Sequence, residues 1–231
     1  MIELPKDKLK ATRKSPKTLI LYGPPKIGKT TILSQLENNL ILDLEKGADF
    51  LDSLRIGVDN PDHLKEIGRE IIKAGRPYKH VSLDTITLLE EWCEMEATNK
   101  YKQSLMGKNF KGNSILSLPN GAGYGLLREE VMPYIRNILP MFAEHIIVVG
   151  HLRDKLIVDK KGEEVSAKDI DLTGKLRNMV CAQADAVGYL FRDGDKLMVS
   201  FETKEDVVCG SRCDHLKGQT FEFSWDRIYI D

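Results

Sequence analysis

The sequence predicts an α/β domain built around a mostly parallel sheet with helices on both faces. Short apolar runs with the composition of buried strands alternate along the chain with longer segments of helical period. Such alternation is typical of parallel sheets that are covered on both sides. Near the C-terminus, two apolar runs instead flank the turn sequence Arg192-Asp193-Gly194-Asp195. This arrangement predicts an antiparallel hairpin that extends the sheet.

The first half of the predicted sheet follows from apolar runs bounded by turn residues. Strands are expected at 18–22, 39–44 and 80–84. Residues 61–74 carry apolar side chains at helical spacing and precede Gly75-Arg76-Pro77, which predicts a helix that stops before the proline. Residues 86–101 return to the helical period and predict a further helix after the third strand.

The second half contains a loop, a long helix and the strongest strand. Residues 103–124 are rich in Gly, Asn, Ser and Lys and are expected to form a mobile loop. A helix is expected over 124–142, with a kink near Pro133 because proline cannot donate a helical hydrogen bond. The run at 145–150 is apolar almost throughout and predicts a buried strand, and residues 156–162 suggest a hairpin.

The composition indicates one globular domain without an excess of positive charge. The chain has 231 residues, 42% of them hydrophobic, and a formal net charge of −1. We expect a single domain over 17–231, preceded by a basic arm over 1–16 that is either a solvated tail or a docking arm for a neighbouring subunit or an acidic polymer. Contact with nucleic acid would require a local basic patch because the overall charge is not positive.

Neither a membrane segment nor a disulfide framework is expected. No apolar run approaches the roughly 20 residues of a membrane span, and the first residues lack the apolar centre of a signal peptide. A cytoplasmic protein without membrane contact is therefore expected, and its four scattered cysteines fit reduced thiols. Cys209, Cys213 and His215 weakly resemble a metal clip but lack a second ligand pair at zinc-finger spacing, so their binding of metal stays open.

One motif indicates the chemistry of the chain. Residues 23–30 read G-x-x-x-x-G-K-T between a predicted strand and helix, a spacing that places backbone N–H groups around the phosphates of a nucleotide. Lys29 is expected to reach the β- and γ-phosphates of ATP, and the Thr30 hydroxyl to bind Mg²⁺. Lys26 stands where many such loops have a small residue and is expected to point to solvent. The predicted nucleotide-binding residues are Gly23, Pro24, Pro25, Lys26, Ile27, Gly28, Lys29, Thr30 and Thr31.

Asp84 ends one predicted strand and Glu45 follows another, and ligands of parallel α/β sheets bind at the carboxyl ends of strands. Asp84 is expected to hold Mg²⁺ through water, with a helix N-cap as the alternative. Glu45 is expected to orient the water that attacks the γ-phosphate. Asp43 lies on the same side of the strand and is its competitor, and a plain surface glutamate is the alternative.

Two further residues complete the predicted catalytic set. His151 follows the strand at 145–150 and is expected to sense the γ-phosphate by hydrogen bonding, with an ordinary strand-end histidine as the alternative. Arg212 is the candidate for a positive group that stabilises charge on the γ-phosphate in the transition state. Lys204 and Lys217 compete with Arg212 for this role, which could also be filled from a neighbouring chain.

Four segments together resemble the RecA-like recombinase ATPases in their order and spacing. They are Tyr22–Thr31 for the phosphate loop, Leu42–Asp49 for the strand with the water-activating glutamate, Leu83–Thr87 for the strand with the magnesium aspartate, and Val148–Arg153 for the sensor strand. The resemblance covers about 17–213 and implies a RecA-like P-loop NTPase fold. His151 stands where such recombinases carry glutamine, which is similar to the small phage-type group of single-strand-annealing or phage nucleotide-binding proteins. A phage-encoded chain would act in the host cytoplasm.

The resemblance implies that loops after the central strands bind single-stranded DNA. The matching segments are 100–123 and 152–176, whose basic residues include Lys100, Lys102, Lys108, Lys111, Arg153, Lys155, Lys160 and Lys161. Phosphate contacts from these side chains would depend on salt and not on base sequence, and plain solvated loops are an equal alternative. A homo-oligomer is expected. Filaments of the RecA type are in doubt because the sequence lacks the additional N-terminal and C-terminal elements of RecA.

Three functions are consistent with these patterns. The first is a Mg²⁺-dependent, DNA-stimulated ATPase that acts on single-stranded DNA in phage-type recombination, repair or replication, with a single-strand-binding or replication protein as a further partner. The second is a nucleotide-switched adaptor such as a helicase loader. The third is a P-loop kinase, which would need an arginine-rich lid. The candidate lid segment, 152–177, has only two arginines, Arg153 and Arg177.

Overall fold

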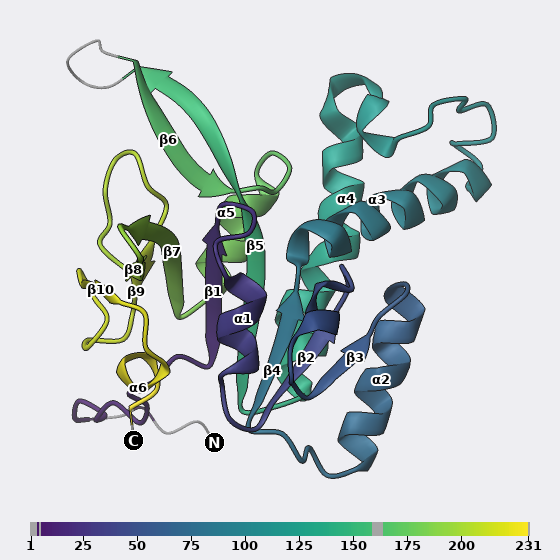
Figure 1. The fold of residues 1–231 in the computed structure, drawn as a ribbon. Helices are drawn as coiled ribbons and strands as arrows, with labels where there is room; N and C mark the ends of the chain where they lie inside the picture. Colours follow the sequence, from purple (N-terminus) through teal and green to yellow (C-terminus); the bar gives the residue numbers. More distant parts are fainter. Residues whose placement is uncertain (1–3, 5, 159–163, 231) are drawn as a thin grey trace.

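Six parallel strands form the body of the sheet in the computed structural model, which describes residues 4, 6–158 and 164–230. Their spatial order is β7-β1-β5-β4-β2-β3. Their bounds are Thr18–Gly23 for β1, Asn39–Asp43 for β2, Arg55–Gly57 for β3, His80–Asp84 for β4, His145–Val158 for β5 and Ala186–Asp193 for β7. The parallel order places the carboxyl ends of all six strands at one edge (Figure 1).

Antiparallel strands extend this sheet at one side and beyond its carboxyl edge. The hairpin of β7 and β8 (Lys196–Ser200) continues to β10 (Thr220–Glu222), and the short β9 (Gly210–Ser211) pairs with the start of β7. Strand β6 (Glu164–Ile170) pairs with the second half of β5. The predicted α/β class, with a mostly parallel sheet and antiparallel C-terminal strands, is confirmed.

Helices cover both faces of the sheet, as predicted. One face packs against α2 (Pro61–Lys73), α3 (Ile86–Gln103), α4 (Ala122–Pro133) and α5 (Leu176–Gln183). The opposite face packs against α1 (Lys29–Ser34) and α6 (Trp225–Ile228). The indole Nε1 of Trp225 donates a hydrogen bond of 2.7 Å to the carbonyl of Ile32, which ties the C-terminal segment to α1.

The segment between α3 and α4 is more ordered in its second half than predicted. It contains the 3₁₀ helices η2 (Ile115–Ser117) and η3 (Pro119–Gly121). Ile115 and Leu118 are buried in a small cluster with Ala97, and the amide of Ile115 donates to the hydroxyl of Thr98 at 2.9 Å. Apolar burial therefore fixes a stretch that composition alone marked as a mobile loop.

The long helix predicted at 124–142 is divided. Helix α4 ends at Pro133 and is followed by the π-helical η4 (Tyr134–Ile138) and the 3₁₀ helix η5 (Leu139–Met141). Pro133 has no N–H with which to continue the regular hydrogen-bond ladder, and the wider π turn follows directly after it. The predicted interruption at Pro133 is a change of helix type.

Strand β5 is longer than predicted because it takes part in two sheets. Its first half pairs with β1 and β4, and from Leu152 onward it pairs with β6. A strand expected to end at Gly150 thus continues into the hairpin suggested near 156–162 (Figure 1). The turn of that hairpin, with Lys160 and Lys161, lies outside the described residues.

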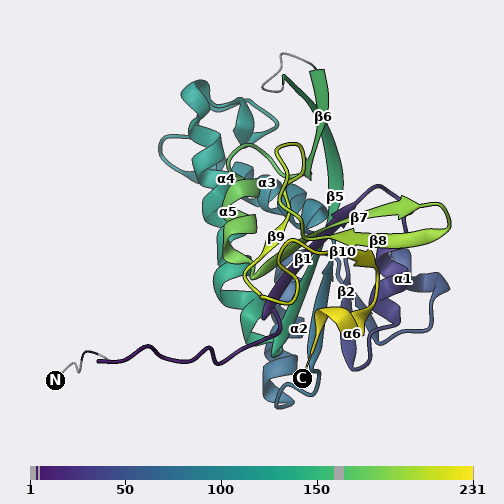
Figure 2. The same cartoon turned by 90° about the vertical axis from the view of Figure 1, so that its left-hand side faces the viewer.

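The N-terminal arm runs away from the sheet over its described residues (Figure 2). At its end, the Ser15 hydroxyl donates to the carbonyl of Ile230 at 2.8 Å, and the carbonyl of Pro16 lies 2.8 Å from Nδ1 of His145. These contacts join the start of β1 to the amino edge of the sheet, opposite the carboxyl edge.

Two helical glycines give opposite expectations for replacement by alanine. A Cβ atom on Gly68 in α2 would overlap the ring of Phe142, which is 2% exposed. A Cβ on Gly125 in α4 would find its nearest neighbour at 3.9 Å. We expect Gly125→Ala to raise the free energy of unfolding by up to ~1 kcal/mol through helix propensity. We expect Gly68→Ala to lower it by about 1 kcal/mol or more because overpacking outweighs the same gain. Urea denaturation of both variants tests this, and equal stabilisation would contradict the packing.

Candidate nucleotide-binding site

The motif at 23–30 forms a tight loop between β1 and α1. Gly23 ends β1 where a Cβ atom would lie 2.7 Å from the carbonyl oxygen of Leu190 on β7, so only glycine fits. Gly28 stands before α1 with φ 111°, a conformation that favours glycine. Lys26 has φ 60° and is exposed, as predicted. The left-handed backbone explains why small residues suit this position in related loops.

Lys29 is buried under the loop that precedes it. The residue is 7% exposed, and its Nζ donates to the carbonyls of Gly23 and Pro24 at 3.1 and 2.9 Å. Burial lowers the pKa of Lys29, while the carboxylates of Asp84 and Glu45 oppose that shift. The Lys29 ammonium thus donates to neutral carbonyl oxygens, and a phosphate anion would be a stronger acceptor for it.

Thr30 in the first turn of α1 is in contact with Asp84 at the carboxyl end of β4. The Thr30 hydroxyl donates to Oδ2 of Asp84 at 2.7 Å. Asp84 is 3% exposed, and burial raises its pKa to about 6, assisted by Glu45 and Asp43 and opposed by the Thr30 hydrogen bond. A hydroxyl and a desolvated carboxylate are hard oxygen ligands, so the pair fits Mg²⁺. Asp84 is not the N-cap of the following helix, which was its alternative role. The side chain of Thr85 caps α3 instead.

Glu45 and His151 are in direct contact, although they are 106 positions apart. His151 Nε2 lies 3.2 Å from Oε1 of Glu45. The Thr85 hydroxyl donates to the same Oε1 at 2.6 Å. Asp43, the competitor of Glu45, accepts the amides of Gly47 and Ala48 at 3.1 and 2.9 Å and so holds the loop after β2.

Arg212 does not lie near the phosphate loop of its own chain. It follows β9, which pairs with the first residues of β7, and its Nη2 donates to the carbonyl of Ala182 at 2.7 Å. This is the amino edge of the sheet, opposite the loop. Arg192, near the carboxyl end of β7, is the arginine beside the loop, and its Nη2 donates to the carbonyl of Ile27 at 3.2 Å. Sequence patterns predicted Arg192 only as part of a turn, because they do not show that β7 pairs with β1.

Other polar residues at this edge were not predicted. Glu90 on α3 is 6% exposed and accepts the amide of Thr173 at 2.9 Å. Burial raises the pKa of Glu90 to about 7. The Thr87 hydroxyl lies 3.4 Å from the amide of His151 and donates to the carbonyl of Asp171 over 3.4 Å. These contacts connect α3 with β5 and with the segment after β6.

The two segments matched to DNA-binding loops differ in what they offer. Lys100 is already paired with Glu130 at 2.7 Å and with Glu96 at 3.7 Å, which reduces its availability for phosphate. The segment 152–176 begins on β5 directly after His151 and includes Arg153, which is exposed. The second segment therefore directly follows a residue of the site, whereas the first segment is separated from the site by the length of α3.

Cys209, Cys213 and His215 do not converge. Cys209 Sγ donates to the carbonyl of Glu202 at 3.0 Å, and His215 Nε2 lies 3.0 Å from the carbonyl of Ile228. Across the described ranges, no group of three or more His, Cys, Asp or Glu side chains is arranged to hold a metal ion.

A glycine-rich loop with a buried lysine, followed by Thr30 against Asp84 at the carboxyl edge of a parallel sheet, defines a P-loop nucleotide-binding domain. A family model described as an AAA domain matches residues 15–213. The chain belongs to this family of AAA domains. A solved structure described as the RadB recombinase is similar at 13% identity and a TM-score of 0.46, covering 93% of this chain and 90% of that one. No curated protein matches the chain.

None of the helices within the described ranges has both the length and the apolar character that crossing a membrane requires.

The pKa of Asp84 predicts how magnesium affects nucleotide binding. A carboxylate must lose its proton to face a cation, so the contribution of Asp84 is present above about pH 6 and is lost as the pH falls below it. We expect the gain in ATP affinity on adding Mg²⁺ to be smaller at pH 5 than at pH 8. Asp84→Asn has no carboxyl group to titrate, so its gain should be small at both values, and any pH dependence that remains in it comes from the nucleotide itself. Calorimetry with and without Mg²⁺ measures it, and an equal gain in wild type and variant at pH 8 would contradict the assignment.

Proposed function

We propose that this chain is a RecA-like, Mg²⁺-dependent ATPase that acts on single-stranded DNA in recombination, repair or replication of the phage type. The observation that carries the proposal is the contact between Glu45 and His151 at 3.2 Å. Glu45 is the candidate for positioning water, and His151 lies on β5, the strand that continues into the hairpin with β6. A change at the nucleotide can thus reach the candidate DNA segment along one strand.

Residues of the loop and residues at the strand ends would bind different parts of Mg·ATP. Lys29 and the amides of the loop 23–31 would hold the triphosphate of ATP, and Thr30 with Asp84 would hold Mg²⁺. The cation, when bound, neutralises charge on the β- and γ-phosphates. Arg192 is the guanidinium that this chain brings to the loop, and we propose it in place of Arg212 for a same-chain positive group. Arg212 stays a proposal only for a site on a neighbouring chain.

Glu45 would position the attacking water and accept its proton. In the structure its Oε1 is occupied by the Thr85 hydroxyl and by His151 Nε2. A carboxylate oxygen that accepts two donors is less available to water. We infer that nucleotide and DNA together draw His151 away from Glu45, and that this frees the carboxylate when the hairpin is engaged. Hydrolysis would then be slow without DNA.

The same contact keeps a second function open. If DNA never released Glu45, the chain would bind ATP without hydrolysing it and would act as a nucleotide-switched adaptor, such as a helicase loader. Tight ATP binding with negligible turnover and co-purification with a replication protein would favour this function. No observation favours a kinase, because Arg177 is paired with Asp169 at 3.1 Å rather than extended as part of a lid.

We also propose a homo-oligomer. The adjacent apolar residues Leu105 and Met106 are almost fully exposed in the single chain, at 85% and 87%. Exposed apolar groups of this size mark interaction surfaces when they gather into patches. The proposal extends to contact with a single-strand-binding or replication protein.

Lys29→Ala and Glu45→Gln should separate binding from hydrolysis. We expect Lys29→Ala to lose most ATP affinity because it removes the charge that meets the phosphates. Glu45→Gln should bind ATP within a fewfold of wild type but lose turnover by roughly 10²-fold or more, the scale of general-base catalysis. Calorimetry and a phosphate-release assay with and without oligodeoxythymidine measure both. If wild type hydrolyses ATP no faster with single-stranded DNA, the recombinase proposal loses its main support.

Thr85→Val should uncouple turnover from DNA. The variant removes one donor from Glu45 and leaves His151 in place, so we expect DNA-independent ATP turnover to rise a fewfold and DNA stimulation to shrink. Thr85→Ser keeps the hydroxyl and serves as the matched control. The lost helix cap costs about 1 kcal/mol of stability, so both variants are assayed below their melting transitions. A fall of basal turnover in Thr85→Val alone would instead mean that Thr85 aims Glu45 at water.

A further inference from the structure

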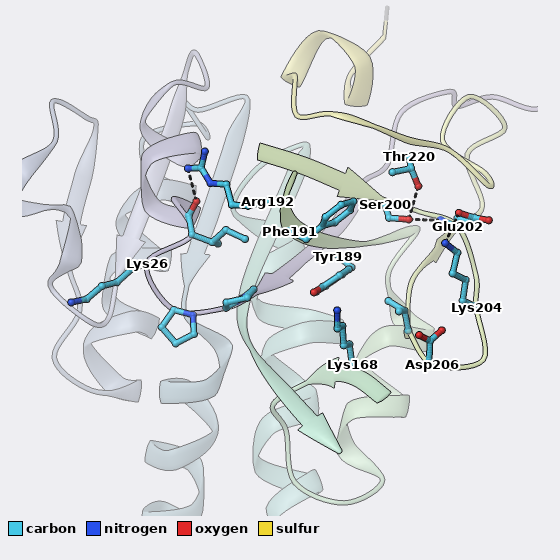
Figure 3. Close-up of a pocket in the computed structure, with 14 residues that line it drawn as sticks. Lys26, Lys168, Tyr189, Phe191, Arg192, Ser200, Glu202, Lys204, Asp206 and Thr220 are labelled. Carbon is cyan, nitrogen blue, oxygen red and sulfur yellow. Dashed lines mark hydrogen bonds and ion pairs between the residues drawn. The ribbon is translucent and has the colours of Figure 1, made fainter. Parts of the chain in front are cut away.

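A second concave site lies beside the phosphate loop. Its cavity volume is about 800 Å³, within the range of small-molecule pockets. The loop segment 24–27 forms one wall, and β6, β7 and the segment after β8 form the others (Figure 3). The described residues that line it include none of Lys29, Thr30, Glu45 and Asp84. It therefore shares the loop segment 24–27 and Arg192 with the nucleotide site but contains none of the side chains assigned to Mg²⁺ or to the attacking water.

Two stacked aromatic rings lie in the middle of this pocket. The rings of Tyr189 and Phe191 on β7 are 5.6 Å apart between centroids and inclined by 15°. The ammonium of Lys168 lies 5.2 Å from the Tyr189 centroid and points toward that ring in Figure 3. Tyr189 is 7% exposed, whereas Phe191 is only partly buried. Phe191 is thus the ring of the pair that retains surface for a ligand.

The polar groups around the rings favour an anionic ligand. Lys168 and Arg192 are cations on two sides of the aromatic pair, while Lys26 extends away from it (Figure 3). Glu202 and Asp206 are the acidic groups of the lining. Glu202 is already paired with Lys204 at 3.0 Å. An aromatic platform next to basic side chains is the combination that binds unpaired nucleotides, whose bases stack and whose phosphates need a counter-charge.

We propose that this pocket binds one nucleotide of single-stranded DNA, with its base stacked on Phe191 and its phosphate beside Lys168. The proposal rests on the function proposed above and adds to it a stacking contact on β7, outside the two loop segments, beside Lys168 of the second segment. It requires no covalent chemistry.

The position of the pocket does not suit the base of bound ATP. The ammonium of Lys29, which meets the β- and γ-phosphates, lies against the carbonyls of Gly23 and Pro24. A triphosphate held by Lys29 would therefore have its terminal phosphate toward the start of the loop and its nucleoside end toward Thr31 and α1. The pocket borders the start of the loop, at 24–27. A nucleotide in the pocket would share that wall with the γ-phosphate, so ATP and DNA could affect each other through four residues.

Two substitutions test the pocket on the full chain. Phe191→Leu keeps an apolar side chain but removes the ring, and Lys168→Ala removes the charge while keeping the backbone carbonyl that accepts from Tyr22. Phe50→Leu and Lys73→Ala are matched controls, since both residues are strongly exposed and lie outside the pocket. The probe is fluorescent oligodeoxythymidine, measured by anisotropy at several salt concentrations. Calorimetry with Mg·ATP and a melting curve accompany each variant.

The expected result is selective loss of DNA affinity. Phe191→Leu should weaken oligodeoxythymidine binding about tenfold, the effect of one lost stacking contact. Lys168→Ala should make the salt dependence shallower by about 0.7, the value for one single-strand phosphate. ATP affinity and the controls should be unchanged, and a 5-iododeoxyuridine oligonucleotide should cross-link to Phe191 or Tyr189.

Each other outcome overturns the proposal in an identifiable way. If wild type binds the oligonucleotide and both variants bind it equally well, DNA lies elsewhere and only the pocket proposal fails. If Phe191→Leu loses ATP and not DNA, the pocket holds the base of ATP. If wild type binds no oligonucleotide at all, the proposed DNA function fails together with the pocket.

Discussion

The parallel register of β1, β5, β4 and β2 is the constraint on which the site depends. Register places Gly23 beside His151 and Asp43 beside Asp84, so four strand ends meet at one edge. Each of these strands carries apolar side chains toward both layers of helices, and a shift by one residue would turn every side chain to the other face. The burial of the sheet therefore fixes the positions of the polar residues at its edge, although those residues contribute little to the core.

The same edge holds charged groups in unfavourable surroundings. Lys29 and Asp84 are both almost fully buried, and burial shifts the pKa of each toward its neutral form. A chain selected only for stability would have little reason to desolvate an ammonium and a carboxylate so close together. Functional sites keep such pairs because a polyanion and a divalent cation restore the missing partners. Glu90 extends this pattern one helical turn beyond the predicted set.

Much of this arrangement could be predicted because its signals are local. The strand at 80–84 and the loop at 23–30 are read from a few consecutive residues, and both are where the sequence places them. The residues that were missed depend on which strands are neighbours. Arg192 reaches the loop because β7 pairs with β1, and Arg212 lies at the far edge because β9 pairs with the start of β7. Neither pairing leaves a trace in spacing or composition, and the contact of Thr85 with Glu45 is equally long-range.

Strand order also determines when the site can exist during protein synthesis. The phosphate loop is made early, but β1 lies between β5 and β7, which leave the ribosome more than a hundred residues later. Helix α1 has only six residues, and its Ile32 carbonyl accepts a hydrogen bond from Trp225, 193 positions later in the chain. Isolated helices of that length are unstable in water. A nascent chain therefore has no ordered site for a nucleotide until the segment that reaches Trp225 has been synthesised.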